Sequence, residues 1–248
     1  MIALSVMACT SQNPFLTEQH TPYGVPAFDQ VQLKHYMPAF QEAIRQNKAE
    51  IEAIVTNPEA PTFANTIEAL DRTGGLVDLV GGAFFNILEA DGNDEMDAIA
   101  NEVSPMLSEL SDGIIMDERL FARVKTVYEQ RDSLDLTAEQ RRLLDETYKS
   151  FVQNGANLPD EAKERLKAIN QELARLSLQF GQNVVAETNA YQLFVTDESE
   201  LDGLPESAKA AAKEEAAAAG RPDAWLFTPK RTSFTPVLQY CENRELRK

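Results

Sequence analysis

The histidines of this chain, His20 and His35, are its only imidazole side chains, and imidazole is a common ligand of catalytic zinc. A zinc-binding helix carries two histidines four residues apart, with a glutamate between them that activates water. Here the two histidines lie too far apart to share one helical face, and neither is followed by Glu. The sequence therefore predicts no catalytic residue, no metal ligand and no cofactor-binding residue within these 248 residues. Each histidine is expected to serve packing or hydrogen bonding.

An acidic segment near the middle of the chain has the spacing of a calcium loop. The residues that match loop positions one, three, five, seven and twelve are Asp91, Asn93, Glu95, Asp97 and Glu102. The sixth position of such a loop must be Gly for its sharp turn, and here it is Met96, which also belongs to a helical apolar stripe. A solvated turn between two helices is the better interpretation, and a calcium-binding helical protein is the weaker alternative.

The charge balance excludes some classes of partner. The chain has 40 acidic and 23 basic residues, a formal charge of −17, and no basic cluster, so no nucleic-acid binding is expected. The sequence also lacks a nucleophile elbow, a phosphate loop, a dinucleotide fingerprint and an apolar run of the ~20 residues that a membrane span needs. Motifs alone do not indicate an enzyme.

The N-terminal residues resemble the cleavage box of a bacterial lipoprotein. A short apolar run, 2–8, ends in Ala8 before Cys9, and the polar residues 10–13 follow. The run is short and no Lys or Arg precedes it, so the signal is incomplete. One interpretation is a shortened lipoprotein signal with a lipid on Cys9, in the bacterial periplasm or envelope. The alternatives are a frayed terminus with an incidental thiol and a cytoplasmic protein.

Helical periodicity organises most of the chain, so the predicted fold class is mainly α. Apolar residues recur every three or four positions between turn-forming residues. Helices are expected over 33–55, 63–88, 96–114, 120–128, 137–151 and 159–184, the second continuing through two Gly-Gly pairs. The longest pattern is amphipathic, and its apolar stripe consists of Ala162, Leu166, Ile169, Leu173, Leu176, Phe180 and Val184.

The C-terminal part has a different sequence pattern, with predicted strands as well as helices. Short strands are predicted at 191–195 and 225–228, on either side of an Ala-rich helix. Thr235 and Pro236 then suit the first positions of a helix that meets no stop signal before Lys248, which indicates a longer protein. The expected divisions are a tail or signal at 1–12, a helical N-terminal lobe at 13–190, a small α/β segment at 191–234 and a truncated helix at 235–248.

An ordered set of short motifs resembles one peptidase family. The motifs are Asn13-Pro14-Phe15-Leu16, Pro22-Tyr23-Gly24-Val25-Pro26-Ala27-Phe28-Asp29, Phe63-Ala64-Asn65-Thr66-Ile67-Glu68-Ala69-Leu70, Phe84-Phe85-Asn86, Gly155-Ala156-Asn157-Leu158, Lys167-Ala168-Ile169-Asn170-Gln171-Glu172-Leu173-Ala174, Leu201-Asp202-Gly203-Leu204-Pro205 and Asn243-Arg244-Glu245-Leu246-Arg247. In this order they are similar to the N-terminal portion of zinc metallopeptidases of the thimet oligopeptidase and bacterial peptidyl-dipeptidase family.

The resemblance implies a function that the motifs of this chain do not carry. Family members have two largely helical lobes around a deep channel, and peptidyl-dipeptidases release C-terminal dipeptides from short unfolded peptides. Their H-E-x-x-H helix lies in the C-terminal part, so no catalytic or metal residue can be assigned here. The chain is expected to form a channel wall and a size filter, inactive alone, with zinc bound elsewhere in the parent protein.

The same resemblance implies the partners: short peptides, the missing C-terminal catalytic domain, and a membrane only through a lipid on Cys9. The alternative is a free-standing, non-catalytic helical module that binds a peptide or another partner. Its support is the missing catalytic site.

Overall fold

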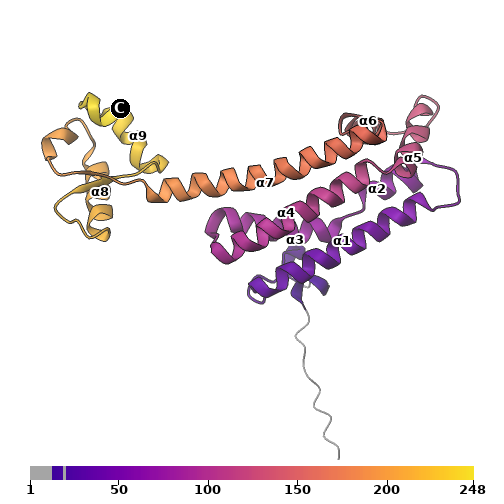
Figure 1. Cartoon of the computed structure of the whole chain (residues 1–248), viewed down its shortest axis with the longest axis horizontal. Coiled ribbons are helices and arrows are strands. Elements are labelled where there is room, and N and C mark those ends of the chain that lie inside the picture. The colour runs from indigo at the N-terminus through magenta and orange to yellow at the C-terminus, as the bar shows by residue number, and fades with distance from the viewer. Residues whose placement is uncertain (1–12, 19–20) are drawn as a thin grey trace, which may run out of the picture. The chain divides into compact units, whose positions relative to one another are not determined.

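Helices make up most of the structure, as the sequence predicts (Figure 1). The computed structural model describes residues 13–18 and 21–248, so Cys9, His20 and the segment that resembles a lipoprotein signal lie outside the described residues. The chain divides into a first unit that ends at Leu178 and a second unit that begins at Gln179. None of the helices in the described part of the chain has the length and apolar character that a bilayer crossing requires.

The first unit contains the elements η1 (Pro14–Leu16), η2 (Pro22–Gly24), α1 (Leu33–Val55), η3 (Phe63–Glu68), α2 (Ala69–Asp71), α3 (Gly75–Asp91), α4 (Asp94–Ile115), α5 (Glu118–Glu129), α6 (Ala138–Gln153) and the first part of α7 (Asp160–Ala190). The second unit contains the end of α7 and then β1 (Leu193–Val195), η4 (Glu198–Leu201), α8 (Glu206–Ala218), β2 (Trp225–Phe227), α9 (Arg231–Tyr240) and α10 (Arg244–Arg247).

The first unit has two hydrophobic cores that share helix α1. One core joins the N-terminal half of α1 to α3 and α4, where the buried rings of Phe40 and Phe84 meet edge to face with centroids 5.6 Å apart. Phe15 of η1 adds a third buried ring, against Tyr36, which anchors the segment 13–18 on this core. Such aromatic pairs contribute about 0.5–1.5 kcal/mol each beyond the area that they bury.

The second core joins the C-terminal half of α1 to η3, α5 and α6. Its fully or almost fully buried side chains include Ile67, Leu120, Leu144 and Phe151. Helix α1 contributes side chains to both cores. The two cores could therefore separate only if α1 broke.

The helix expected over 63–88 is interrupted, which corrects the prediction. Gly74 adopts a φ of 81°, a left-handed conformation that ends α2 and precedes α3. Its N–H donates to Glu50 Oε2 of α1 at 2.8 Å, and a Cβ here would lie 3.4 Å from Asn47 Nδ2. The second glycine pair, 81–82, remains inside α3 as expected. Of the four glycines, only Gly74 therefore lies in a turn.

The second unit contains the predicted strand-helix-strand arrangement. β1 and β2 pair antiparallel, with Leu193 opposite Phe227, and α8 lies between them in the sequence. The buried side chains of Val195, Leu201, Phe227 and Val237 form the core of this unit. Helix α9 therefore packs into the same core as the sheet.

The C-terminal helix differs from its prediction at both ends. α9 begins at Arg231 rather than at Thr235, and it ends at Tyr240 rather than continuing to Lys248. The backbone is extended at the buried residue Cys241, and the Glu242 N–H donates to the Asp202 carbonyl at 2.8 Å. Two features accompany this end of the helix: the contact with a loop distant in sequence, and Asn243, whose side chain caps the next helix, α10.

Candidate functional site

The structure assigns His35 a local structural role. It is the third residue of α1, it is buried, and its Nδ1 accepts a hydrogen bond from the Gln32 N–H at 3.0 Å. Its carbonyl also accepts from Asn13 Nδ2 at 2.7 Å. His35 is therefore a buried hydrogen-bonding residue, in line with the expected packing or hydrogen-bonding role.

The acidic segment is a helix-capping turn between α3 and α4. The Asn93 side chain accepts from the N–H groups of Glu95 and Met96, and Met96 is buried in the first core. This agrees with the preferred interpretation of the segment. Among residues 13–18 and 21–248, no group of three or more His, Cys, Asp or Glu side chains is arranged to hold a metal ion.

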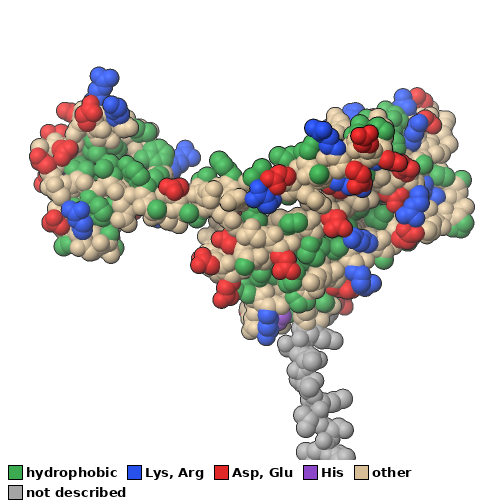
Figure 2. All heavy atoms as spheres, viewed as in Figure 1, with side chains coloured by type: hydrophobic (Ala, Val, Ile, Leu, Met, Phe, Trp, Pro, Cys, Tyr) green, Lys and Arg blue, Asp and Glu red, His purple; other side chains and the backbone are tan. Residues whose placement is uncertain are grey.

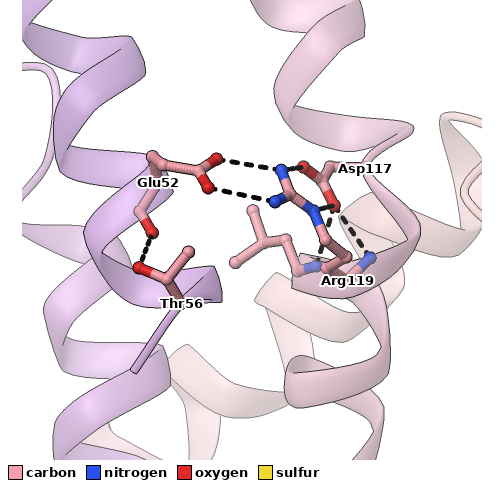
Figure 3. Close-up of polar contacts among 5 residues, drawn as sticks. Glu52, Thr56, Asp117 and Arg119 are labelled. Carbon is pink, nitrogen blue, oxygen red and sulfur yellow. Dashed lines mark hydrogen bonds and ion pairs between the residues drawn. The ribbon is translucent and has the colours of Figure 1, made fainter. Parts of the chain in front are cut away.

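A polar cluster joins α1 to the start of α5 (Figure 3). The Arg119 guanidinium donates to both carboxylate oxygens of Glu52, at 3.1 and 3.0 Å, and to Asp117 Oδ2 at 2.8 Å. Burial raises the pKa of Asp117, but hydrogen bonds from the Arg119 side chain and from the Leu120 and Arg119 N–H groups outweigh it, and the net pKa is lowered. Glu52 links α1 to α5 and Asp117 caps the start of α5, so the cluster is structural.

Helix α7 is attached to the first unit by polar contacts. Lys163 Nζ donates to Glu118 Oε1 of α5 at 2.9 Å, and this hydrogen bond lowers the pKa of Glu118. Further along, Asn170 Nδ2 donates to Asp112 Oδ1 of α4 at 2.7 Å. Leu178 packs against the first core. These contacts fix which face of α7 is turned toward the first unit.

The apolar stripe of α7, unlike Lys163 and Asn170, is mostly exposed. Its exposed members are Ile169, Leu173, Leu176, Phe180 and Val184. An amphipathic helix ordinarily turns its apolar face to a core. Here the face toward the first unit includes Lys163 and Asn170, and Phe180 is 71% exposed. Figure 2 shows hydrophobic side chains exposed along α7.

The exposed stripe continues into a part of α7 that has no charge. No Asp, Glu, Lys or Arg lies between Arg175 and Glu187, in a chain that is 25% charged. Gly181 costs about 1 kcal/mol relative to Ala in a helix, and Val, Asn and Thr cost up to about 0.7 kcal/mol each. A helix of this composition is marginal in water without tertiary contacts. The exposed residues of the stripe are therefore candidate interaction surfaces within each unit: Ile169, Leu173 and Leu176 in the first, and Phe180 and Val184 in the second.

Comparison with known proteins identifies homologues along almost the whole chain. No family model matches it. The chain is 39% identical over 238 residues to the dipeptidyl carboxypeptidase of Escherichia coli, and 28% identical over 235 residues to oligopeptidase A of the same species. It is also 28% identical over 243 residues to the organellar oligopeptidase A of Arabidopsis thaliana.

These matches cover most of the chain but only a minor part of each relative. They include 96%, 95% and 96% of this chain, and 35%, 34% and 30% of the respective relatives. The matched segment is the N-terminal part of the relatives. The chain thus spans about a third of the length of the curated peptidases that it matches.

Proposed function

We propose that this chain, a homologue of the dipeptidyl carboxypeptidases and oligopeptidases A, is the N-terminal part of a zinc-dependent peptidyl-dipeptidase. The observation that carries the proposal is the 39% identity along 96% of the chain to a protein named dipeptidyl carboxypeptidase. The parent protein would release dipeptides from the C-terminus of short unfolded peptides.

Zinc does not fit the residues that the structure describes. His35 uses Nδ1 to accept the Gln32 N–H, and no suitable group of ligands surrounds either its ring or any other described side chain. We therefore assign the zinc ligands and the general base to a C-terminal catalytic part of the parent. No step of the reaction is assigned to this chain.

The role that we assign to this chain is a channel wall and a size filter. A wall that excludes folded proteins must resist bending, and α1 supports this by contributing to both cores of the first unit. In this proposal the wall is formed by residues 13–190, the small α/β segment by 191–234, and residues 235–248 lead toward the catalytic part.

The test compares the protein encoded by the complete reading frame with the 248-residue chain. Both are incubated with short peptides whose C-termini are free or amidated, before and after zinc removal by a chelator. We expect the longer protein to release dipeptides from free C-termini only, to lose this activity with zinc, and to regain it when zinc returns. Stoichiometric zinc binding and peptide hydrolysis by the 248-residue chain would contradict the proposal.

A second candidate function is a free-standing peptide- or partner-binding module, and the exposed apolar stripe of α7 favours it. A monodisperse 248-residue protein that melts cooperatively and binds short unfolded peptides would support this alternative. Aggregation through the exposed apolar surface would count against it.

We also propose a lipid on Cys9, which would locate the parent protein in the periplasm or envelope of a bacterium, whereas an unmodified Cys9 would favour the cytoplasm. The support is the sequence around Cys9 alone, since this residue lies outside the described range. Mass spectrometry of the N-terminal peptide from the membrane fraction of the native host tests it. An N-terminus without a lipid would reject the assignment.

A further inference from the structure

We infer that the N-terminal arm, residues 13–32, rests on the surface of a lipid bilayer, an inference that rests on the lipid proposed for Cys9. The structure describes residues 13–18 and 21–32 of this arm, all within the first unit. The side chains that we assign to the contact are the exposed Leu16, Tyr23, Val25 and Phe28.

Both ends of the arm are fixed at the same residue of α1. At one end Asn13 Nδ2 donates to the His35 carbonyl at 2.7 Å, and at the other end the Gln32 N–H donates to His35 Nδ1 at 3.0 Å. Phe15 is buried in the first core, and Val31 packs against that core. The arm is therefore a closed loop at the N-terminal end of α1, and its exposed side chains belong to the part between these anchors.

The middle of this loop holds an aromatic ring in solvent. Tyr23 is fully exposed, at 102%, and its φ of 62° lies in the left-handed region. That conformation is costly for a residue with a Cβ and persists only where its surroundings enforce it. Pro22 and Gly24 flank the ring, and the Thr21 hydroxyl donates to the Val25 carbonyl across the turn. A ring held in solvent by a constrained turn is well placed to meet a partner outside the chain.

The chemistry of the arm favours an uncharged lipid surface. A phenol ring suits the boundary between headgroups and hydrocarbon, because its body is apolar and its hydroxyl is polar. The other three exposed side chains of the contact are apolar. Residues 13–32 include Glu18 and Asp29 but no Lys or Arg, so the arm lacks the basic cluster that attracts anionic lipids. Zwitterionic headgroups are therefore the expected partner.

The position of Cys9 identifies the occupant. Cys9 precedes Asn13 by four positions, so at most about 14 Å of chain separates them. A lipid on Cys9 would therefore keep the anchored end of the arm within that distance of the bilayer. A single acyl chain binds a membrane weakly and reversibly, and stable attachment requires a second contact. A diffusing protein partner has no such enforced proximity, so the bilayer is the better occupant.

The first experiment measures binding of the 248-residue chain to phosphatidylcholine vesicles after one acyl chain has been coupled to Cys9 through a maleimide. Cys241→Ser leaves Cys9 as the only thiol of this chain. We expect Tyr23→Ser and Phe28→Ser each to weaken vesicle binding at least roughly fivefold, because each removes aromatic surface that the bilayer would bury. Binding that neither variant changes would overturn the inference.

Each variant has a matched control in the second unit. Phe180 is 71% exposed against 47% for Phe28, and Tyr240 is exposed like Tyr23. A general affinity of exposed rings for lipid would make Phe180→Ser and Tyr240→Ser at least as damaging as the arm variants. We expect the two controls to stay within about twofold of the unsubstituted chain, as surface substitutions ordinarily do. Equal losses in the arm variants and their controls would overturn the assigned face.

The lipid composition tests the charge argument. Because the chain has a formal charge of −17 and the arm has no basic residue, phosphatidylglycerol in the vesicles should weaken binding of the acylated chain. Stronger binding to the anionic vesicles would contradict a contact through apolar and aromatic side chains.

Two other occupants are tested without vesicles. Nitration of Tyr23 in the protein encoded by the complete reading frame should proceed as in the 248-residue chain. A ring that is protected only in the complete protein would be covered by the rest of the polypeptide, which would overturn the inference. So would a dimer of the unacylated chain, seen by sedimentation, that Tyr23→Ser abolishes.

The same measurements separate this inference from the lipid proposed for Cys9. An unmodified Cys9 in the native host, with vesicle binding of the chemically acylated chain that depends on Tyr23, would contradict the lipid and support the membrane contact of the arm. A lipid on Cys9, with vesicle binding that Tyr23→Ser and Phe28→Ser leave unchanged, would contradict the arm alone.

Discussion

At the residue scale, two arginines on α5 illustrate how burial decides what a charge contributes. Arg119 is exposed, as is its partner Glu52, whereas its second partner, Asp117, is largely buried (Figure 3). Arg123, one turn further along α5, is buried and donates to the carbonyls of Asn57 and Glu59 and to Asn65 Oδ1. Arg123 thus holds the segment that follows α1 against α5, while Arg119 adds an exposed ion pair between α1 and α5.

We expect Arg123→Gln to lower the free energy of unfolding by about 2–3 kcal/mol, since it removes the hydrogen bonds that the buried, charged guanidinium donates to the carbonyls of Asn57 and Glu59. Arg119→Gln serves as the matched control and is expected to cost only about 0–1 kcal/mol, as exposed ion pairs do. Urea denaturation followed by circular dichroism measures both. Equal costs for the two variants would contradict the structural assignment of Arg123.

The pKa of Asp117 predicts a specific dependence of stability on pH. Its folded-state pKa lies below the ordinary value of 3.8, so between the two values the unfolded chain binds more protons than the folded chain. The stabilisation is therefore fully present above pH 3.8 and is lost as the pH falls through the lowered folded-state pKa. We expect the stability difference between wild type and Asp117→Asn to shrink as the pH falls from about 5 to about 3. A stability difference between the two proteins that stays constant over this pH range would contradict the lowered pKa of Asp117.

At the element scale, the end of α9 depends on one glycine in a distant loop. Gly203 has a φ of 87°, and a Cβ at this position would lie 2.3 Å from the Tyr240 carbonyl oxygen and 2.9 Å from Glu242 Cγ. Gly220 has a similar φ of 81°, but a Cβ there would meet nothing within 4 Å. Substitution of Gly220 by Ala therefore measures the cost of the backbone conformation alone, and the same substitution at Gly203 adds the cost of steric overlap.

We expect Gly203→Ala to destabilise the second unit by about 3 kcal/mol or more, because it adds a steric clash to the left-handed backbone. Gly220→Ala, with backbone strain alone, is expected to cost about 1–2 kcal/mol. Fluorescence of Trp225, the only tryptophan of the chain, reports the unfolding of this unit. Similar losses in the two variants would refute the proposed close approach.

The elements could be predicted where their signals are local. The capping box at Thr137 and Gln140 has both of its hydrogen bonds, because both partners lie within one turn. The break at Gly74 was missed because it depends on Glu50 and Asn47 of α1, whose proximity no local pattern indicates. Sequence periodicity correctly identified α7 as amphipathic, but the ion pair of Lys163 and the hydrogen bond of Asn170 decide which face meets the first unit.

At the scale of the whole molecule, two units with separate cores are joined through the single helix α7. The boundary falls directly after Leu178, the residue of α7 that packs against the first core. Separate cores imply separate cooperative transitions, since a chain unfolds as one state only when its parts share stabilising contacts.

We expect the 248-residue chain to unfold in two transitions in urea. Trp225 fluorescence follows the second unit alone, whereas far-ultraviolet circular dichroism is dominated by the helices of the first unit. The two probes should give different midpoints, and Gly203→Ala should shift only the fluorescence midpoint. Coincident midpoints in both proteins would disprove independent unfolding.

The sequence by itself determined the helical class, the small strand-helix-strand arrangement and, through its ordered motifs, the kinship with the peptidases that the chain matches. These properties are carried by residues close together in the chain, or by their order along it. The tertiary structure alone decided that the stripe of α7 is exposed, that α9 ends at Tyr240 and that Gly74 forms a turn. Each of these depends on contacts between distant residues, and periodicity specifies an apolar face without specifying what covers it.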